Sequence, residues 1–176
     1  QTTEKQAIAR YAASLIEPDD CVYLDAGTTT GWMIEYIRQE KATYITNALS
    51  HAKRLADKGF SVILIGGEPK SSTDAIVGGE AVLNLQKYHF SKGFFGVNGV
   101  DRLSGFTTPD VKEAVVKQAA VKNTQPAHRY FLTTSSKFGE VYAVTFAGFE
   151  GGTILTEDNV SEVLPKSIEI INVTQQ

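Results

Sequence analysis

Apolar positions along the chain form two kinds of pattern, helical spacings and short continuous runs. The first helical spacing places Ile8, Tyr11, Ala12, Leu15 and Ile16 at i, i+3, i+4, i+7 and i+8, which predicts an amphipathic helix. Further helices are predicted at 33–37, 48–58, 79–85 and 109–122. Continuous apolar runs predict strands at 21–24, 44–46, 60–65, 93–97, 130–133, 143–146, 153–155 and 168–173.

The order of these elements indicates the fold class. Nearly continuous apolar strands that alternate with helices are typical of a mostly parallel, Rossmann-like sheet with helices on both faces. No internal repeat or long linker divides the chain, so we expect a single domain over residues 1–176. The polar segment 69–74 is expected to be a loop. Ligands of such α/β sheets bind beyond the carboxyl ends of the strands.

Composition excludes several classes of protein. The chain carries 17 Lys+Arg and 20 Asp+Glu, a net charge of −3, which argues against this segment alone gripping a nucleic-acid backbone. No apolar run approaches the roughly 18 residues of a membrane helix, and Cys21 is the only cysteine. We therefore expect a cytoplasmic protein without a membrane span or an internal disulfide. Because the chain begins with Gln1, we expect it to be part of a longer protein.

The sharpest local motif is Asp25-Ala26-Gly27-Thr28-Thr29-Thr30, which joins a strand to a helix. Backbone N–H groups at a helix N-terminus favour an anion, and three hydroxyls add donors suited to phosphate oxygens. Neither G-x-x-x-x-G-K-[ST] nor G-x-G-x-x-G is present, so the common nucleotide loops are excluded. The alternative interpretation is a helix N-cap with a glycine turn.

A second set of polar residues surrounds the predicted helix at 109–122. Asn98-Gly99 ends a strand, and Thr108-Pro109 is expected to start the helix as N-cap and first helical residue. Asp110, Glu113 and Lys117 then fall on one polar stripe. The apolar face is expected at the following positions: Val111, Ala114, Val115, Gln118 and Ala119. The structural alternative is an ordinary surface pair between Glu113 and Lys117.

Other strand ends add small and polar groups at the same edge of the sheet. Asn47, Gly66-Gly67 and Lys137 each follow a predicted strand, so they are expected near the threonine loop. The three histidines have no metal-ligand spacing, and no cofactor motif is present. We expect neither a metal nor a cofactor.

Several of these motifs occur together and in a fixed order. They are Asp25 to Thr30, Ile45 to Ala48, Leu64 to Glu68, Phe95-Gly96 with Asn98-Gly99, Gly105 to Asp110, Glu113-Ala114 with Lys117, and Ser135 to Phe138. The ordered set resembles the C-terminal effector-sensing domain of DeoR-family transcriptional repressors, from about Glu4 to the C-terminus. One departure is Gln118-Ala119-Ala120, where relatives often carry a basic residue and a methionine.

This resemblance implies a bacterial repressor of sugar metabolism whose effector is a phosphorylated sugar. It implies a fold similar to ribose-5-phosphate isomerase, glucosamine-6-phosphate deaminase and CoA transferases. Operator DNA would be bound by an N-terminal helix-turn-helix domain missing from this chain, and the protein would form a homo-dimer or homo-tetramer.

The resemblance also assigns roles to individual residues. The phosphate would be bound by Gly27, Thr28, Thr29, Thr30, Lys117 and Lys137. The sugar would be read by Asp25, Asn47, Gly66, Gly67, Asn98, Gly99, Asp110 and Glu113. No residue is assigned a catalytic role.

Two other functions stay open. A sugar-phosphate isomerase or deaminase of the similar fold would need a carboxylate base near the substrate, for which Asp25, Asp110 and Glu113 are candidates. Asn98 stands where these isomerases carry acidic residues, and an asparagine cannot act as a base. A purely structural oligomerisation domain would leave the Gly, Thr and Lys residues at the strand ends unexplained.

Overall fold

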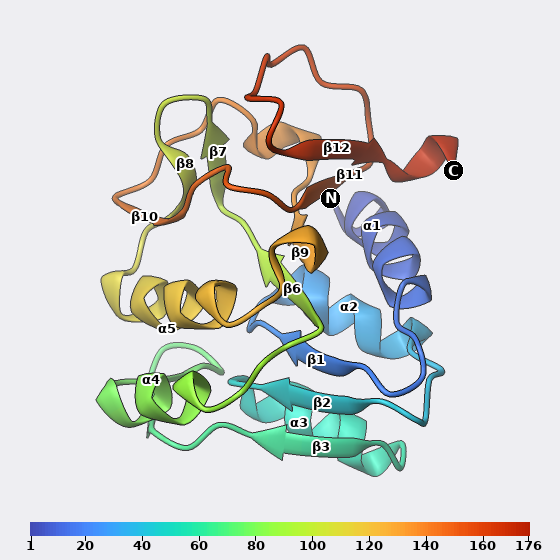
Figure 1. Ribbon diagram of the computed structural model, residues 1–176, viewed down its shortest axis with the longest axis vertical. Helices are drawn as coiled ribbons and strands as arrows, with labels where there is room; N and C mark the ends of the chain where they lie inside the picture. The colour runs from blue at the N-terminus through green and yellow to red at the C-terminus, as the bar shows by residue number, and fades with distance from the viewer.

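The main structural element is a seven-stranded parallel sheet. The computed structural model describes residues 1–176, and its sheet has the order β12-β11-β9-β6-β1-β2-β3, with β12 at the top of Figure 1 and β3 at the bottom. The strands are β1 (Cys21–Leu24), β2 (Thr43–Thr46), β3 (Ser61–Leu64), β6 (Lys92–Gly96), β9 (Arg129–Leu132), β11 (Thr153–Thr156) and β12 (Glu169–Asn172). Every pairing in this sheet is parallel, as the strand-helix-strand pattern predicted.

Successive strand residues face opposite sides of the sheet, and in the central strands both sides are buried. In β1, Val22 and Leu24 belong to one apolar cluster while Tyr23 belongs to the other. In β6, Phe94 and Phe95 divide in the same way. This two-sided burial explains why the strands read as continuous apolar runs.

Five helices cover the two faces. Side chains of α1 (Thr2–Ser14), α2 (Thr28–Tyr36) and α3 (Leu49–Asp57) complete the cluster that contains Val22. The helices α4 (Gly79–Gln86) and α5 (Val111–Lys122) complete the cluster that contains Tyr23. The prediction of helices on both faces is therefore confirmed. None of these helices is both long and apolar enough to cross a membrane.

A second, antiparallel sheet covers part of the face that carries α5. It has the order β10-β8-β7, formed by β7 (Gly99–Asp101), β8 (Gly105–Thr108) and β10 (Val144–Ala147). Phe106 of β8 stacks on Phe131 of β9 with ring centroids 3.9 Å apart. The sequence patterns missed β7 and β8, because their glycines and threonines read as a turn. The remaining elements are β4 (Glu68–Pro69), β5 (Ile76–Val77) and the short helices η1 (Pro126–His128), η2 (Ser135–Lys137) and η3 (Val173–Gln175).

The start and the buried face of α5 differ from the prediction. Thr108 ends β8 and pairs with β10, so the N-cap is Asp110, whose carboxylate accepts from the Lys112 and Glu113 N–H groups. Three residues of the predicted apolar face are exposed: Val111 by 59%, Val115 by 48%, and Gln118. The buried positions are instead Ala114, Val116, Lys117, Ala120 and Val121. The buried face of α5 is therefore turned about the helix axis relative to the predicted face. The prediction placed Lys117 on the polar side, whereas its side chain is buried.

Candidate anion-binding site at the carboxyl ends of the strands

A cavity of about 270 Å³ lies beyond the carboxyl ends of β1, β6 and β9. The sheet order reverses between β1 and β6, since the chain continues from β1 to β2 on one side and returns to β6 on the other. Ligands of open α/β sheets bind at such a point. The cavity is lined by Lys5, Ala26, Gly27, Thr28, Thr29, Gly96, Val97, Asn98, Thr108, Pro109, Glu113, Lys117, Leu132, Thr134 and Lys137.

The N-terminus of α2 forms one wall of this cavity. Gly27 is the N-cap with φ +145°, a conformation that side chains other than glycine rarely adopt. The first helical hydrogen bond runs from the Gly31 N–H to the Gly27 carbonyl, so the preceding N–H groups have no intrahelical partner. These groups and the helix dipole together favour an anion.

The three threonines of this loop are placed differently. Thr28 is exposed and Thr29 is nearly buried, and both line the cavity. Thr30 is fully buried, and its hydroxyl donates to the Asp25 carbonyl at 2.6 Å. The Thr30 hydroxyl therefore links the first turn of α2 to the backbone of Asp25. The Thr28 and Thr29 side chains are available to a ligand.

Lys117 and Asp25 form a buried ion pair at the floor of the cavity. The Lys117 ammonium donates to the Asp25 carboxylate and to the Gly96 carbonyl at 2.9 Å, while the Gly96 N–H donates to Asp25 at 3.1 Å. Burial raises the pKa of Asp25, and the Lys117 charge and the Gly96 N–H act against that rise. An ammonium has three donors, so Lys117 keeps one for a ligand. The expected surface pair between Glu113 and Lys117 does not form.

Two further cations and one amide face the same cavity. Lys137 follows β9 within η2 and lines the cavity, as its position after a strand predicted. Lys5 reaches it from α1 and donates to the Thr28 hydroxyl at 2.8 Å. The Asn98 carbonyl oxygen accepts from the Thr108 hydroxyl at 3.1 Å, which leaves the amide N–H₂ of Asn98 free to donate.

The carboxylates of Asp110 and Glu113 share one lysine. The Lys70 ammonium lies 2.6 Å from Asp110 and 2.8 Å from Glu113. The contact with Lys70 lowers the pKa of Asp110, and the two carboxylates raise the pKa of Lys70. Glu113 lines the cavity, whereas Asp110 does not. Lys70 fixes the segment between β4 and β5 against the start of α5.

Four of the residues expected to read the sugar do not line the cavity: Asn47, Gly66, Gly67 and Gly99. Asn47 is 2% exposed and accepts from the Tyr23 hydroxyl and the Ala26 N–H, while its amide donates to the Ile76 carbonyl. Its hydrogen bonds position the loop that contains Ala26. A Cβ on Gly67 would lie 2.8 Å from Ile76, and one on Gly99 would lie 2.3 Å from the Glu140 carbonyl oxygen. Neither Gly66 nor these two glycines line the cavity.

Sequence reasoning missed three polar residues at or beside the site. Lys5 lies on the first helix, and a single lysine on an amphipathic helix reads as a solvent-exposed residue. Lys70 lies in the polar segment 69–74, for which the sequence predicted a loop and no function. Thr134, which follows β9, adds a buried hydroxyl to the cavity. Only Thr134 could have been found from the sequence. It directly precedes the Ser135 to Phe138 motif and follows a predicted strand, whose carboxyl end lies at the same edge of the sheet as the threonine loop.

The chemistry of the cavity is that of anion binding. Lys5, Lys117 and Lys137 line the cavity together with the N-terminus of α2. The nearby carboxylates already have lysine partners, Asp25 with Lys117 and Glu113 with Lys70. No group of three or more His, Cys, Asp or Glu side chains is arranged to hold a metal ion.

The arrangement of the strands and helices defines an α/β fold of the ribose-5-phosphate isomerase type. The structure of ribose 5-phosphate isomerase A from Neisseria gonorrhoeae superposes with a TM-score of 0.55 over 76% of this chain and 52% of that chain. The two sequences are 11% identical, so the likeness shows the fold alone.

Sequence comparison identifies the family. The chain belongs to the DeoR family, because the model of the DeoR C terminal sensor domain matches residues 1–159. An uncharacterised HTH-type transcriptional regulator, FruR of Bacillus subtilis, is 46% identical over 156 residues, 88% of this chain and 61% of the relative. The lactose phosphotransferase system repressor of Staphylococcus aureus is 36% identical over 172 residues, 96% of this chain and 67% of the relative. The chain thus spans about two thirds of these relatives.

Proposed function

We propose that this domain senses a phosphorylated sugar for a cytoplasmic transcriptional repressor of sugar metabolism. The observation that carries the proposal is the cavity beside β1, where the N-terminus of α2 faces Lys5, Lys117 and Lys137. A phosphate dianion fits this set of donors, because charge-assisted hydrogen bonds are roughly twice as strong as neutral ones. The names of the relatives, a FruR regulator and a lactose phosphotransferase system repressor, support sugar metabolism as the context.

Operator DNA would be bound by a part of the whole protein outside this chain. The relatives are named HTH-type regulators and repressors, and the present chain spans about two thirds of their length. A ligand that binds one arrangement of the subunits better than another shifts the population toward it. The effector would in this way change how well two DNA-binding domains fit their half-sites.

Sensing without catalysis is supported over isomerase or deaminase activity. A general base must be within reach of the substrate and free to take a proton. Asp25 contacts a lysine and an N–H group, Glu113 contacts Lys70, and Asn98 cannot act as a base. The cavity therefore offers a substrate no carboxylate without a cationic partner.

Replacement of Lys137 tests the phosphate assignment. Lys137→Ala should weaken binding of a sugar phosphate roughly 10- to 150-fold in calorimetric titration, because a hydrogen bond to a charged group is worth about 1.5–3 kcal/mol. The matched control is Lys122→Ala, an exposed lysine at the end of α5 that lies outside the cavity. Equal affinity of the two variants would remove Lys137 from the site.

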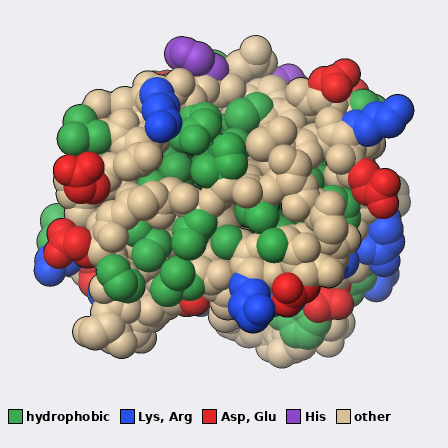
Figure 2. Space-filling view, turned by 90° about the horizontal axis from the view of Figure 1, so that it is seen from below, with side chains coloured by type: hydrophobic (Ala, Val, Ile, Leu, Met, Phe, Trp, Pro, Cys, Tyr) green, Lys and Arg blue, Asp and Glu red, His purple; other side chains and the backbone are tan.

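Self-association through β3 is the second part of the proposal. The strand β3 is an unpaired sheet edge without any charged residue, and Ile63 and Leu64 are 39% and 38% exposed. Figure 2 views this side of the molecule and shows apolar side chains across its middle with charged ones mainly at the margins. The opposite edge, β12, carries Glu169. Charged residues protect sheet edges from pairing, so β3 is the edge suited to a second copy of the chain.

Sedimentation measurements test this edge. Ile63→Lys should shift the chain toward monomer, because an ammonium placed at the edge opposes strand pairing. Ile170→Lys on β12 is the control and should leave the sedimentation coefficient unchanged. Dissociation by the β12 variant alone would place the interface at the other edge.

A further inference from the structure

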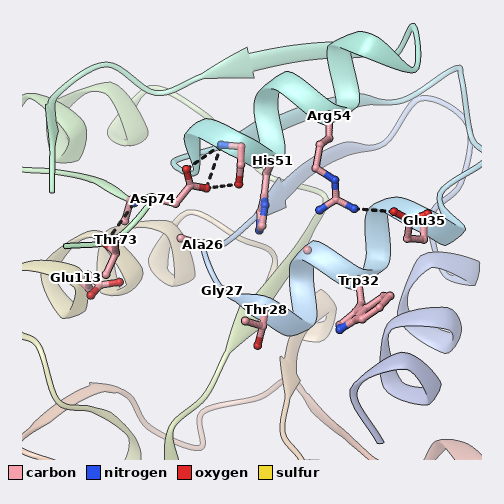
Figure 3. Close-up of a pocket in the computed structure, with 13 residues that line it drawn as sticks. Ala26, Gly27, Thr28, Trp32, Glu35, His51, Arg54, Thr73, Asp74 and Glu113 are labelled. Atoms are coloured by element: carbon pink, nitrogen blue, oxygen red, sulfur yellow. Dashed lines mark hydrogen bonds and ion pairs between the residues drawn. The ribbon is translucent and has the colours of Figure 1, made fainter. Parts of the chain in front are cut away.

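A larger cavity lies on the other side of the Gly27–Thr28 loop. Its volume is about 570 Å³, and it opens between α2 and α3 (Figure 3). The two cavities share Ala26, Gly27, Thr28 and Glu113, so a single loop separates them. The additional walls come from Trp32 and Glu35 of α2, His51 and Arg54 of α3, and Thr73 and Asp74 before β5. None of these six residues is used by the proposed phosphate site.

His51 presents a buried acceptor without a partner. Its side chain is almost completely buried, and its Nε2 lies 3.1 Å from the Thr30 hydroxyl oxygen. Since that hydroxyl gives its proton to the Asp25 carbonyl, Nε2 must carry the hydrogen and donate it. The lone pair therefore belongs to Nδ1, which is buried with no hydrogen-bond partner. Burial also lowers the pKa of His51, which keeps the ring neutral.

An unpartnered buried acceptor requires a physical explanation, because nearly all buried polar atoms in proteins are hydrogen-bonded. A hydroxyl group is a donor that Nδ1 could accept from. A phosphate dianion or a carboxylate has no hydrogen to give to it. A ligand that satisfies Nδ1 must therefore bring a donor such as a hydroxyl group.

Carboxylates outnumber cations around the cavity, with Glu35, Asp74 and Glu113 against Arg54. Arg54 is paired with Glu35 at 2.9 Å, and Asp74 accepts from the backbone N–H and the hydroxyl of Ser50. The guanidinium keeps further N–H donors, and the carboxylates keep further lone pairs. Mixed donors and acceptors without an unpaired cation, next to the Trp32 ring, suit an uncharged polyhydroxyl group better than an anion.

Gly31 allows α3 to approach α2 at this point. A Cβ at position 31 would lie 3.1 Å from His51 Cε1 and 3.5 Å from Arg54 Nη1. A glycine inside a helix lowers its stability relative to alanine, so the close approach is made at some expense of helix stability. The glycine at position 31 thus leaves room for the His51 and Arg54 side chains of α3.

We propose that this cavity is a second binding subsite, which takes an uncharged polyhydroxyl group beside the phosphate site. The inference rests on the proposed function, since it places a phosphate across the Gly27–Thr28 loop. Two sources have the required chemistry: the sugar end of the bound sugar phosphate, or a separate uncharged sugar.

Trp32 gives a direct readout, because it is the only tryptophan of the chain. The protein is titrated with inorganic phosphate, with fructose and with fructose 1-phosphate, and both Trp32 emission and heat are recorded. We expect fructose 1-phosphate to change Trp32 emission at concentrations where inorganic phosphate does not. A response to fructose alone would identify a separate sugar as the occupant.

Three further results overturn one or both proposals. Heat from fructose 1-phosphate without any change in Trp32 emission would overturn the second subsite and leave the sensor function intact. Equal emission changes with inorganic phosphate and fructose 1-phosphate would also overturn it, since the signal would then report the phosphate site. Neither heat nor emission change with any of the three compounds would count against both.

Variants on α2 and α3 separate the subsite from the phosphate site. Arg54→Gln and Gly31→Ala should each weaken fructose 1-phosphate roughly tenfold or more and leave inorganic phosphate unchanged. Gly31→Ala adds a good helix former, so it keeps the proposal testable if Arg54→Gln unfolds the domain. The control is Lys53→Gln, on the exposed side of α3 in a pair with Asp57. If both test variants bind the compound that changes Trp32 emission, fructose 1-phosphate or fructose, as tightly as the parent chain does, the subsite is contradicted.

Discussion

At the scale of single residues, burial decides what a charged side chain does. Glu113 and Lys117 have the i, i+4 spacing of a surface pair, yet Lys117 is 6% exposed and its partner is Asp25, 92 residues away. The Lys117 ammonium also lies 5.1 Å from the centroid of the Phe146 ring. An ion pair with so little access to water is sensitive to the loss of either partner.

Removal of Lys117 should therefore destabilise the unliganded domain. Lys117→Met leaves a buried carboxylate without its cation, and such a loss costs about 3–5 kcal/mol. The corresponding surface pair would have cost only a few tenths of a kcal/mol. Urea denaturation measures the difference, with Lys112→Met on the exposed side of α5 as the control.

A double-mutant cycle isolates the pair itself. Asp25→Asn combined with Lys117→Met removes both charges, so the double variant should be more stable than the sum of the two single losses predicts. Additive free energies of unfolding would show that the two side chains do not interact in the folded domain.

At the scale of elements, α5 begins where a carboxylate can cap it. Asp110 accepts from the N–H groups of Lys112 at 2.8 Å and Glu113 at 3.0 Å, and it also contacts Lys70. The Asp110 side chain therefore has two roles: it caps the first turn of α5, and it binds Lys70 in the segment between β4 and β5. Thr108-Pro109 predicted a helix start two residues too early because β8 was not recognised.

Two substitutions at Asp110 separate the cap from the ion pair. Asp110→Ala removes both, and the lost cap alone should cost about 1 kcal/mol of the free energy of unfolding. Asp110→Asn keeps a capping oxygen and loses only the charge, so a partly exposed pair predicts a loss below about 1 kcal/mol. Equal losses in urea denaturation would assign the stability to the ion pair and not to the cap.

At the scale of the whole molecule, a charged cluster lies beneath the start of the central strands. The Lys92 ammonium, 6% exposed, lies 2.6 Å from Asp20 and 2.7 Å from Glu17. Burial acts to raise the pKa of Asp20, but Lys92, the Glu17 N–H and the Ser91 hydroxyl outweigh it, and the pKa is lowered. Burial acts to lower the pKa of Lys92, but its two carboxylate partners raise it overall.

These shifts predict how stability depends on pH. Because the folded pKa of Asp20 is lowered, its contribution is complete above its ordinary value of 3.8 and is lost as the pH falls through the folded pKa. The raised pKa of Lys92 keeps its contribution complete up to its ordinary value of 10.5 and loses it at still higher pH. Stability from this cluster should therefore be constant between about pH 5 and pH 9.

The Lys92→Met variant tests this assignment. Without the ammonium, burial of Asp20 is opposed only by neutral donors, so acid unfolding should begin at a higher pH than in the parent chain. Urea midpoints measured between pH 2 and pH 7 check the shift, with exposed Lys41→Met as control. Parallel curves for the parent and Lys92→Met would remove the cluster from the acid transition.

The sequence alone determined the order and type of most elements. Continuous apolar runs predicted all seven strands of the parallel sheet. In the central strands the reason is burial of both faces, whereas the edge strand β3 is apolar and largely exposed. The site loop was also visible as the motif Asp25 to Thr30 between a predicted strand and a predicted helix. The structure then shows Gly27 in a backbone conformation that only glycine adopts easily.

The tertiary structure decided which partners meet. The ion pairs Asp25–Lys117 and Lys70–Glu113 join segments that are far apart in the chain, and so does the pairing of β10 with β8. The buried face of α5 likewise depends on elements distant in the sequence. Local spacing reports the neighbours of a residue on its own helix or strand, whereas burial depends on the elements packed against it. For this reason the sequence identified Asn47 only as a polar strand end. Its hydrogen bonds to Tyr23, Ala26 and Ile76, which position the site loop, became visible only in the tertiary structure.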